Sequence, residues 1–393
     1  MALNDITFIK GEGGLGRPLL GEDHISGFAQ FYAAADLPSG FSITDRIKQV
    51  FSIGEVEQLG IVKGSATTGI THYHLSEYFR MQPKGNIFIG LFDSVSIDYT
   101  AIETVQNFAD GKIRQIAVYD SIAFATATVQ TLQTSALALE IAHKPLSVLY
   151  AANFQAIANI TALPDLAALA SQNVTVVVGE DGNGVGGALA ISETKSITTL
   201  GATLGAVSLS AVHENIGGVQ KFPMSNGTEL DVPSFAIGTA LVMVKTHATA
   251  SLSALRDKGY SFMLKHVGNA NTFTVDSFTS TAVTSDYRTI ENNRTIDKAT
   301  RGVRAFILPF LNSPLSINSN GTLAEETIAL FKAESESPLE TMEIAGELSD
   351  FLVQIDPTQN VVSTSKIEIS IKVVPKGVAR YIDIKIGFAV NLN

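Results

Sequence analysis

Between residues 86 and 181 the sequence alternates apolar runs with helix-length segments, and this alternation constrains the fold more than any other feature. The segments between the runs, at 98–111, 128–143 and 163–172, have helical composition, and Asp98 and Gly111 are suitable caps for the first. Strands that are apolar at nearly every position are buried on both faces, as in a parallel sheet covered by helices. The sequence therefore predicts a parallel α/β domain over 86–285. Its apolar runs are NIFIGLF (86–92), KIRQIAVYD (112–120), LSVLYAAN (146–153) and VTVVVGED (174–181).

The rest of the chain divides into three further regions. Residues 1–20 contain a short alternating strand, with Ile6 and Phe8 on one face, and then a glycine-rich segment. Residues 21–85 are a mixed region of short strands with a helix around THYHLSEYFRM. Residues 286–393 predict an α+β domain, with a long helix over 287–308 and two helical stretches over 322–337 and 338–349. The predicted fold class is therefore α/β and α+β, with β arms at both ends of the chain.

A hairpin is predicted at the C-terminal end. Apolar residues alternate over 367–373, a Pro375–Gly377 turn follows, and apolar residues alternate again in the segment 382–393. Short strands at both ends of a chain present open edges, which invite pairing with another chain. If both arms pair with neighbouring copies without closing a ring, the result is a helical filament or a stack of rings. The arm residues of the second strand are Ile382, Ile384, Ile386, Phe388 and Val390.

Two glycine clusters raise the alternative of a nucleotide-dependent α/β enzyme. The glycines Gly11, Gly13, Gly14 and Gly16 satisfy G-x-G-x-x-G. A dinucleotide site requires a helix directly after this motif, whereas Pro18 and two further glycines follow here. The second cluster lies in VVVGEDGNGVGGAL at 176–189. Its glycines follow a strand but have neither Rossmann nor P-loop spacing. We interpret the first cluster as a bending linker and the second as a long loop.

The segment THYHLSEYF offers His72, His74 and Glu77 as metal ligands. On a strand, His72 and His74 would share one face, but no third ligand has a clear spacing. The absence of cysteine excludes disulfides and thiolate metal sites. Isolated histidines are more often structural, and hydrolase and kinase signatures are absent. We therefore expect no catalytic residue, no metal and no cofactor.

Composition restricts the partners. Charged residues make up 17% of the chain, below the roughly 25% usual for a soluble domain, which indicates a surface covered by partners. The net charge of −11 disfavours general nucleic-acid binding. No run reaches the roughly 20 apolar residues of a membrane helix, and no basic start with an apolar segment marks a signal peptide.

The helix expected at 287–308 carries a basic stripe. Arg294, Lys298 and Arg301 fall on one stripe, with Arg304 beside it, opposite an apolar stripe that includes Val303. One interpretation is a solvated basic face on a helix that packs against the core. The other, in a chain of negative net charge, is a binding face for an acidic protein partner.

Several motifs match a known family. They are R-x-I-D within NNRTIDKATRGVRAF, G-E in EIAGELSD, D-P-x-x-N in DPTQN, and P-x-G-x-A-x-x-I in PKGVARYI. In these motifs the last third of the chain resembles the C-terminal domain of contractile tail sheath proteins. The stretch ALRDKGYSFMLKHVGNANTFTVDSFTS is similar to the sheath middle domain, and the N-terminal half to the branch of Mu-like and Bacteroidetes-type phages. The matching residues are Arg294, Ile296, Asp297, Gly346, Glu347, Asp356, Pro357, Pro375, Gly377, Ala379 and Ile382.

The resemblance implies a non-enzymatic, mechanical subunit of a virion tail sheath, assembled in the host bacterial cytoplasm. Such subunits form hexameric rings stacked helically around a tail tube and contract to drive the tube through a target envelope. The implied partners are other copies, the tail tube protein, and the baseplate and tail terminator proteins, with no nucleic acid and no direct membrane contact. A passive lattice or surface protein is a further alternative, because it would share the arms but not the contraction.

The resemblance also implies roles for particular segments. The N-terminal arm 1–20 and the C-terminal arm 382–393 would add strands to small sheets of adjacent subunits, with the first glycine cluster as a hinge. The helices of the C-terminal domain would line the lumen and contact the tube. The tube-facing role falls on Arg294, Lys298, Arg301 and Arg304, or alternatively on the acidic stretch LETMEIAGELSD.

Overall fold

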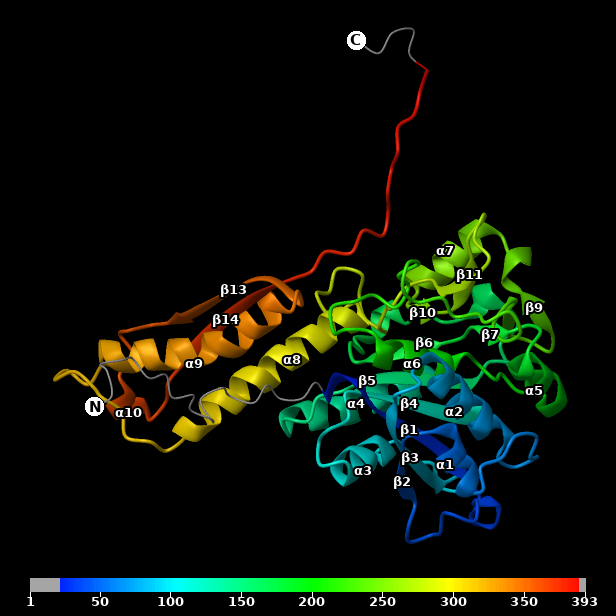
Figure 1. Cartoon of the computed structure of the whole chain (residues 1–393), viewed down its shortest axis with the longest axis horizontal. Helices are drawn as coiled ribbons and strands as arrows, with labels where there is room; N and C mark the ends of the chain where they lie inside the picture. The colour runs from blue at the N-terminus through cyan, green and yellow to red at the C-terminus, as the bar shows by residue number, and fades with distance from the viewer. Residues whose placement is uncertain (1–21, 389–393) are drawn as a thin grey trace, which may run out of the picture.

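A computed structural model describes residues 22–388, which form two bodies joined by one long helix (Figure 1). The larger body contains a seven-stranded sheet with the order β10-β6-β5-β4-β1-β3-β2. Every neighbouring pair is parallel except β2 and β3. The predicted parallel α/β sheet is confirmed. Its strands are β1 (Ile25–Tyr32), β2 (Ile47–Val50), β3 (Asn86–Asp93), β4 (Gln115–Ala123), β5 (Ser147–Asn153), β6 (Val174–Val177) and β10 (Tyr260–Ser261).

Helices cover both faces of this sheet. Successive side chains of a strand point to opposite faces, so Phe28 belongs to one core and Ala29 to the other. The first core lies under α2 (Gly69–Met81) and α6 (Leu200–Leu209), and the second under α3 (Ala101–Phe108) and α4 (Thr126–Ile141). Within residues 22–388, no helix has the length and apolarity needed to cross a bilayer.

The region 21–85 is not separate from the α/β domain, contrary to the boundary expected at residue 85. Its strand β1 lies between β3 and β4, and its strand β2 forms the edge of the same sheet. The short helix α1 (Ile53–Gln58) precedes α2 on the first core. These 64 described residues supply a central strand, because β1 is buried on both faces and pairs with β3 along its whole length.

The predicted helix at 163–172 is wrong. The structure has only a 3-10 turn there, Ala167–Leu169. Asp165 accepts a hydrogen bond from the Ala167 backbone, and Ala170 has the left-handed conformation (φ 51°) that ends the turn. Short polar side chains that bond to nearby backbone groups favour turns over helices.

Smaller elements extend the α/β body. Strand β7 (Glu180–Asp181) forms a three-stranded sheet with β8 (Pro233–Ala236) and β9 (Leu241–Met243). Strands β11 (Met263–Lys265) and β12 (Thr272–Thr274) form a separate pair. The helices α5 (Val185–Glu193) and α7 (Thr249–Asp257) lie in this region (Figure 1).

The C-terminal domain is a helical layer with a two-stranded sheet. It contains α8 (Ile290–Ile307), α9 (Glu325–Ile344), β13 (Leu348–Ile355), α10 (Val361–Thr364) and β14 (Ile369–Pro375). Helices α8 and α9 lie side by side and pack with the sheet around Leu339, Met342 and Leu348 (Figure 1). The α+β prediction is confirmed.

Two details of that domain differ from the sequence predictions. The stretches 322–337 and 338–349 form one continuous helix, α9, with Pro338 inside it. A proline inside a helix normally disrupts it. Here Pro338 is buried and packs closely against Gly302 of α8, and α9 continues through it. The predicted hairpin is also wrong, because β14 pairs antiparallel with β13 rather than with the described arm residues 382–388.

The packing of α6 on α2 depends on glycine. A Cβ atom on Gly201 would lie 1.9 Å from the His74 carbonyl oxygen. We expect Gly201→Ala to lower the free energy of unfolding by about 3 kcal/mol, because a well-packed core cannot absorb the extra methyl group. The control is Gly54→Ala in α1, where the nearest atom is 3.9 Å away, and we expect it to stabilise by up to about 1 kcal/mol. Urea unfolding measures both, and equal stability of the two variants would contradict the packing.

Candidate assembly surfaces

The C-terminal segment 382–388 is extended and apolar, and it pairs with no strand among residues 22–388. After β14 the chain continues as an extended segment that leaves the body (Figure 1). Its residues Ile382, Ile384, Ile386 and Phe388 are between 76% and 111% exposed. Burying such a side chain gains roughly 1.5–3 kcal/mol, so four exposed in a row indicate a surface that another molecule covers.

The small sheet of the C-terminal domain offers edges to such a strand. It contains only β13 and β14, so each strand has one edge without a strand partner among the described residues. Two-stranded sheets are marginal by themselves, and open edges are templates for a further strand. Among residues 22–388, one extended apolar segment and two sheet edges are therefore without a strand partner.

An apolar groove adjoins the start of β14. It has a volume of about 690 Å³ and lies among the end of α8, α9 and α10. Leu311 and Val362 are among its most exposed residues, at 68% and 65%. The groove adds apolar surface beside the open edge. Its apolar lining includes Ile307, Leu311, Ile317, Phe331, Val362 and Ile369.

The other predicted arm residues lie outside the described part of the chain. They are Ile6, Phe8, Gly11, Gly13, Gly14 and Gly16 at the N-terminal end and Val390 at the C-terminal end. Their roles stay predictions.

The basic stripe on α8 faces the subunit interior over most of its length. Arg294 is only 3% exposed. Its guanidinium donates hydrogen bonds to the Ser210 hydroxyl (2.7 Å) and to the Asp23 carbonyl oxygen (3.1 Å). Burial lowers the pKa of Arg294 to about 10, against the raising effect of Asp23 and other carboxylates. The expectation of a binding face for a partner is wrong for Arg294 in this conformation, because the side chain is enclosed.

Lys298 and Arg301 belong to an ion-paired group that we call the junction cluster, together with Asp23 and Glu347. Lys298 bonds to Asp23 (2.7 Å) and to Glu347 (2.6 Å), and Arg301 lies 3.3 Å from Asp23. Burial alone would raise the pKa of Asp23, but the hydrogen bond from Lys298 and the neighbouring cations lower it. The cluster joins the start of the α/β domain to α8 and to the end of α9. The charges of Lys298 and Arg301 are thus neutralised within the subunit, contrary to a free binding face.

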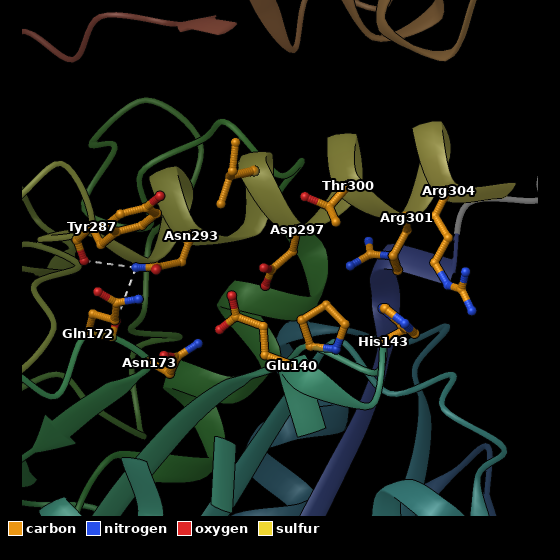
Figure 2. Close-up of a pocket in the computed structure, with 12 residues that line it drawn as sticks. Glu140, His143, Gln172, Asn173, Tyr287, Asn293, Asp297, Thr300, Arg301 and Arg304 are labelled. Atoms are coloured by element: carbon orange, nitrogen blue, oxygen red, sulfur yellow. Dashed lines mark hydrogen bonds between the residues drawn. The ribbon is translucent and has the colours of Figure 1, made fainter. Parts of the chain in front are cut away.

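Arg304 differs from the other three cations. It is exposed, and no ion pair within residues 22–388 involves it. Figure 2 shows Arg304 and Arg301 extending from α8 toward His143, which follows the end of α4. Arg304 is the member of the stripe that is accessible to a partner.

A polar pocket of about 260 Å³ separates α8 from the α/β domain (Figure 2). Asp297, on α8, points into it toward Glu140 of α4. Burial raises the pKa of Asp297 to about 7; Arg301 opposes this shift and Glu140 adds to it. The pocket therefore holds a carboxyl group that titrates near neutral pH.

This titration predicts a pH effect on stability. Because the pKa of Asp297 is above 3.8 in the folded chain, the native state binds the proton more tightly, and stability falls as pH rises from about 4 to 7. We expect Asp297→Asn to remove this fall in stability between about pH 4 and 7. At pH 8 the variant should be more stable than the wild type by about 2 kcal/mol, a figure reduced to allow for solvent screening of the charge. Urea unfolding between pH 4 and 8 measures it. Asp383→Asn, in the exposed arm, should keep the slope, and an unchanged slope in Asp297→Asn would refute the assignment.

The histidine motif forms no metal site within residues 22–388. It lies on α2, not on a strand, so His72 and His74 point in different directions. His72 contacts Glu57 (2.9 Å), and Glu77 pairs with Arg80. His74 is fully buried against Tyr119 (ring centroids 4.8 Å apart), and burial lowers its pKa to about 3. His74 acts as a neutral core residue.

The second glycine cluster does not present a free anion site. It connects β6 through β7 to α5, and the Val185 amide at the start of α5 already bonds to the Glu229 carboxylate (2.8 Å). Burial raises the pKa of Glu229, and the neighbouring Asp181 carboxylate adds to this shift. A phosphate at this turn would meet like charges. The first cluster lies outside the described residues.

Sequence reasoning missed part of the junction. Asp23 gave no signal, because its partners on α8 are more than 270 residues away in the sequence. Glu347 belongs to the G-E family motif and to the acidic stretch LETMEIAGELSD, but neither indicates that Lys298 is its partner. The contacts of Arg380 with Asp276 and Glu291 were also missed, although Arg380 lies inside the matched P-x-G-x-A-x-x-I motif.

Comparisons with known proteins agree with this architecture. The family model described as DUF2586, N-terminal domain, matches residues 44–278, and DUF2586, C-terminal domain, matches residues 286–393. A comparison with curated protein sequences gave no match.

Three solved structures of sheath assemblies or sheath proteins have a similar fold. The contracted helical sheath of the anti-feeding prophage is 14% identical, with full coverage of both chains and a TM-score of 0.62. The contracted PVC sheath complex of an extracellular contractile injection system is 12% identical, with 99% coverage of both chains and a TM-score of 0.61. A sheath tail protein from Listeria innocua is 10% identical over 89% of this chain and 94% of that chain, with a TM-score of 0.52. The described part of the chain therefore has the fold of contractile tail sheath proteins.

Proposed function

The chain belongs to the DUF2586 family, and from its sheath fold we propose that it is a structural subunit of a contractile tail sheath. The subunit polymerises as stacked rings around a tail tube and contracts to drive the tube through a target envelope. The observation that carries this proposal is the apolar segment 382–388, which is exposed. Within residues 22–388 this segment has no strand partner, and the small sheet has two open edges. Such a subunit completes its β structure only with other copies.

The geometry supports strand addition between subunits. The segment points away from the small sheet of its own chain (Figure 1), whereas the edges of β13 and β14 lie on the C-terminal domain. The C-terminal arm of one copy pairs with an edge in a second copy, and its apolar face covers surface such as the groove beside β14. The N-terminal arm, residues 1–20, occupies the other edge. Two arms and two edges per subunit give a continuous mesh.

The tube-facing surface belongs to the C-terminal domain. Arg304 is the accessible cation of the α8 stripe, while Arg294, Lys298 and Arg301 maintain the subunit in this conformation. The acidic alternative is the end of α9, where Glu340 and Glu343 are exposed. The remaining proposed partners are the baseplate and tail terminator proteins, and the proposed location is the virion tail, assembled in the host cytoplasm.

Two other functions predict different results. A nucleotide-dependent enzyme is disfavoured because carboxylates surround the glycine loop after β6. A passive lattice protein would form one lattice of a single diameter.

Electron microscopy of the purified protein, with and without the tail tube protein, tests the proposal. We expect tubes, with a long narrow form on the tail tube and a short wide form after contraction. Micromolar binding of NAD or ATP in equilibrium dialysis without tubes would favour the enzyme. A single lattice of one diameter in all conditions would favour the passive protein.

A further inference from the structure

The base of the C-terminal arm is attached to the body of the subunit. Residues 376–381 leave β14 and pass along the boundary between the two domains, where Arg380 binds two carboxylates. Its Nε lies 2.9 Å from Asp276, and its Nη2 lies 3.0 Å from Glu291 and 3.2 Å from the second oxygen of Asp276. Asp276 follows β12, and Glu291 is in the first turn of α8. One arginine thus contacts the α/β domain and the C-terminal domain at once.

The two carboxylates are buried, which separates this contact from an ordinary surface ion pair. Asp276 is 6% exposed and Glu291 is 3% exposed. Asn215 donates to both of them, at 2.8 Å and 3.0 Å, and Ser277 bonds to each. Among the described residues, Arg380 supplies the one cation in ion-pair contact with either carboxylate. Loss of that cation would leave two buried negative charges side by side, which is costly.

Two aromatic residues also take part in holding the base of the arm. The guanidinium of Arg380 lies 5.5 Å from the centre of the Phe278 ring. The next residue, Tyr381, accepts a hydrogen bond from Arg256 of α7 at 2.7 Å. The side chains of residues 382–388 are exposed, so the free part of the arm begins directly after these contacts.

We propose that Arg380 is a positioning residue, which fixes the point and direction at which the C-terminal arm leaves the subunit by binding Asp276 and Glu291 at the domain boundary. The inference rests on the proposed function, because a fixed exit matters only when the arm links subunits. A force on the arm is then transmitted through Arg380 to both domains of the subunit, and it does not act directly on the two-stranded sheet of β13 and β14. The free part of the arm therefore begins after the Arg380 contact, not at Pro375 where β14 ends.

The test uses distance measurement in the full-length monomer, below the concentration at which it assembles. The chain contains no cysteine, so Asp383→Cys in the arm and Ala138→Cys on the exposed side of α4 take one spin label each. All labelled chains also carry Tyr381→Ala, which removes the hydrogen bond from Arg256 and leaves Arg380 to hold the arm. In Arg380→Gln on this background, the free tether before the label grows from three residues (381–383) to eight (376–383), and the width of the distance distribution should increase about 1.6-fold, with the square root of tether length.

Three further variants complete the test. The exposed Lys385→Gln removes a cation from the arm beyond the contact and should leave the distribution narrow. Arg380→Lys retains the charge and should restore most of the narrow distribution. If Arg380→Gln does not fold, the variant Arg380→Gln with Asp276→Asn and Glu291→Gln removes the buried charges as well and should still broaden the distribution.

A distribution as narrow in the folded Arg380 variants as in the labelled chain that retains Arg380 would overturn the inference, whether or not the protein forms tubes. Failure of the wild type to form tubes would overturn the proposed function, and the monomer measurement would still report on the Arg380 contact. The two failures are therefore distinguishable.

Discussion

Removal of residues 382–393 is expected to abolish the assembly of tubes while the chain still folds. Within the deleted segment, residues 382–388 carry four exposed apolar side chains and pair with no strand in the described part of the chain. Each such side chain gains roughly 1.5–3 kcal/mol when a neighbour covers it, and this gain is lost at every subunit contact. Electron microscopy shows whether tubes form, and thermal unfolding of the monomer measures whether the truncated chain is still folded. We expect no tubes and an unchanged melting temperature.

A matched pair of variants separates the apolar face of the arm from its length. Ile384→Asp with Ile386→Asp places charges on the apolar face and should act like the deletion. Asp383→Asn with Lys385→Gln changes the opposite face of the same strand and should still form tubes. Normal tubes from the isoleucine variant or from the truncated chain would refute a role of the arm in assembly.

The second large effect is expected at the junction cluster. Asp23→Asn keeps the shape of the side chain but removes the negative charge shared by Lys298 and Arg301. We expect the free energy of unfolding to fall by about 2–3 kcal/mol, because breaking a largely buried ion pair leaves uncompensated charge. Urea unfolding at pH 7 measures the loss.

The pH dependence of this contribution has a definite sign. The pKa of Asp23 is lowered in the folded chain, so its contribution is present above pH 3.8 and is lost as pH falls through the lower folded value. The wild type and Asp23→Asn should therefore converge in strongly acidic solution. Asp36→Asn, an exposed residue of the same domain, is the control and should unfold like the wild type. An equal loss in both variants, or a difference that persists in strong acid, would contradict the assignment.

The parallel sheet was predictable because its evidence is local. An apolar run such as 146–153 and the helix before it can be identified from their own residues, and they alternate along the chain. Strand β1 was not recognised as part of that sheet. It precedes β3 by more than 50 residues in the sequence, and the choice of its partners is a long-range property.

The errors at the C-terminal end have a related cause. The alternation of apolar and polar residues correctly identified β14 and residues 382–388 as extended segments. It does not show which strand each of them pairs with. The structure pairs β14 with β13, and residues 382–388 have no strand partner in the part of the chain that it describes. In the same way, the helical wheel placed Arg294 with Lys298, but it could not show that Ser210 and Asp23 cover Arg294. What encloses a helix face depends on residues remote in the sequence.

Crosslinking between differently marked copies tests the central claim most directly. One copy carries Ile386→Cys in the arm, and the other carries Ser370→Cys on β14 or Gln354→Cys on β13, in a chain without other cysteines. If the arm adds a strand to a neighbour, a disulfide joins the two kinds of copy in assembled tubes and is absent from monomers. A disulfide that forms within single monomers carrying both cysteines, or tubes in which neither edge position crosslinks to the arm, would contradict the account.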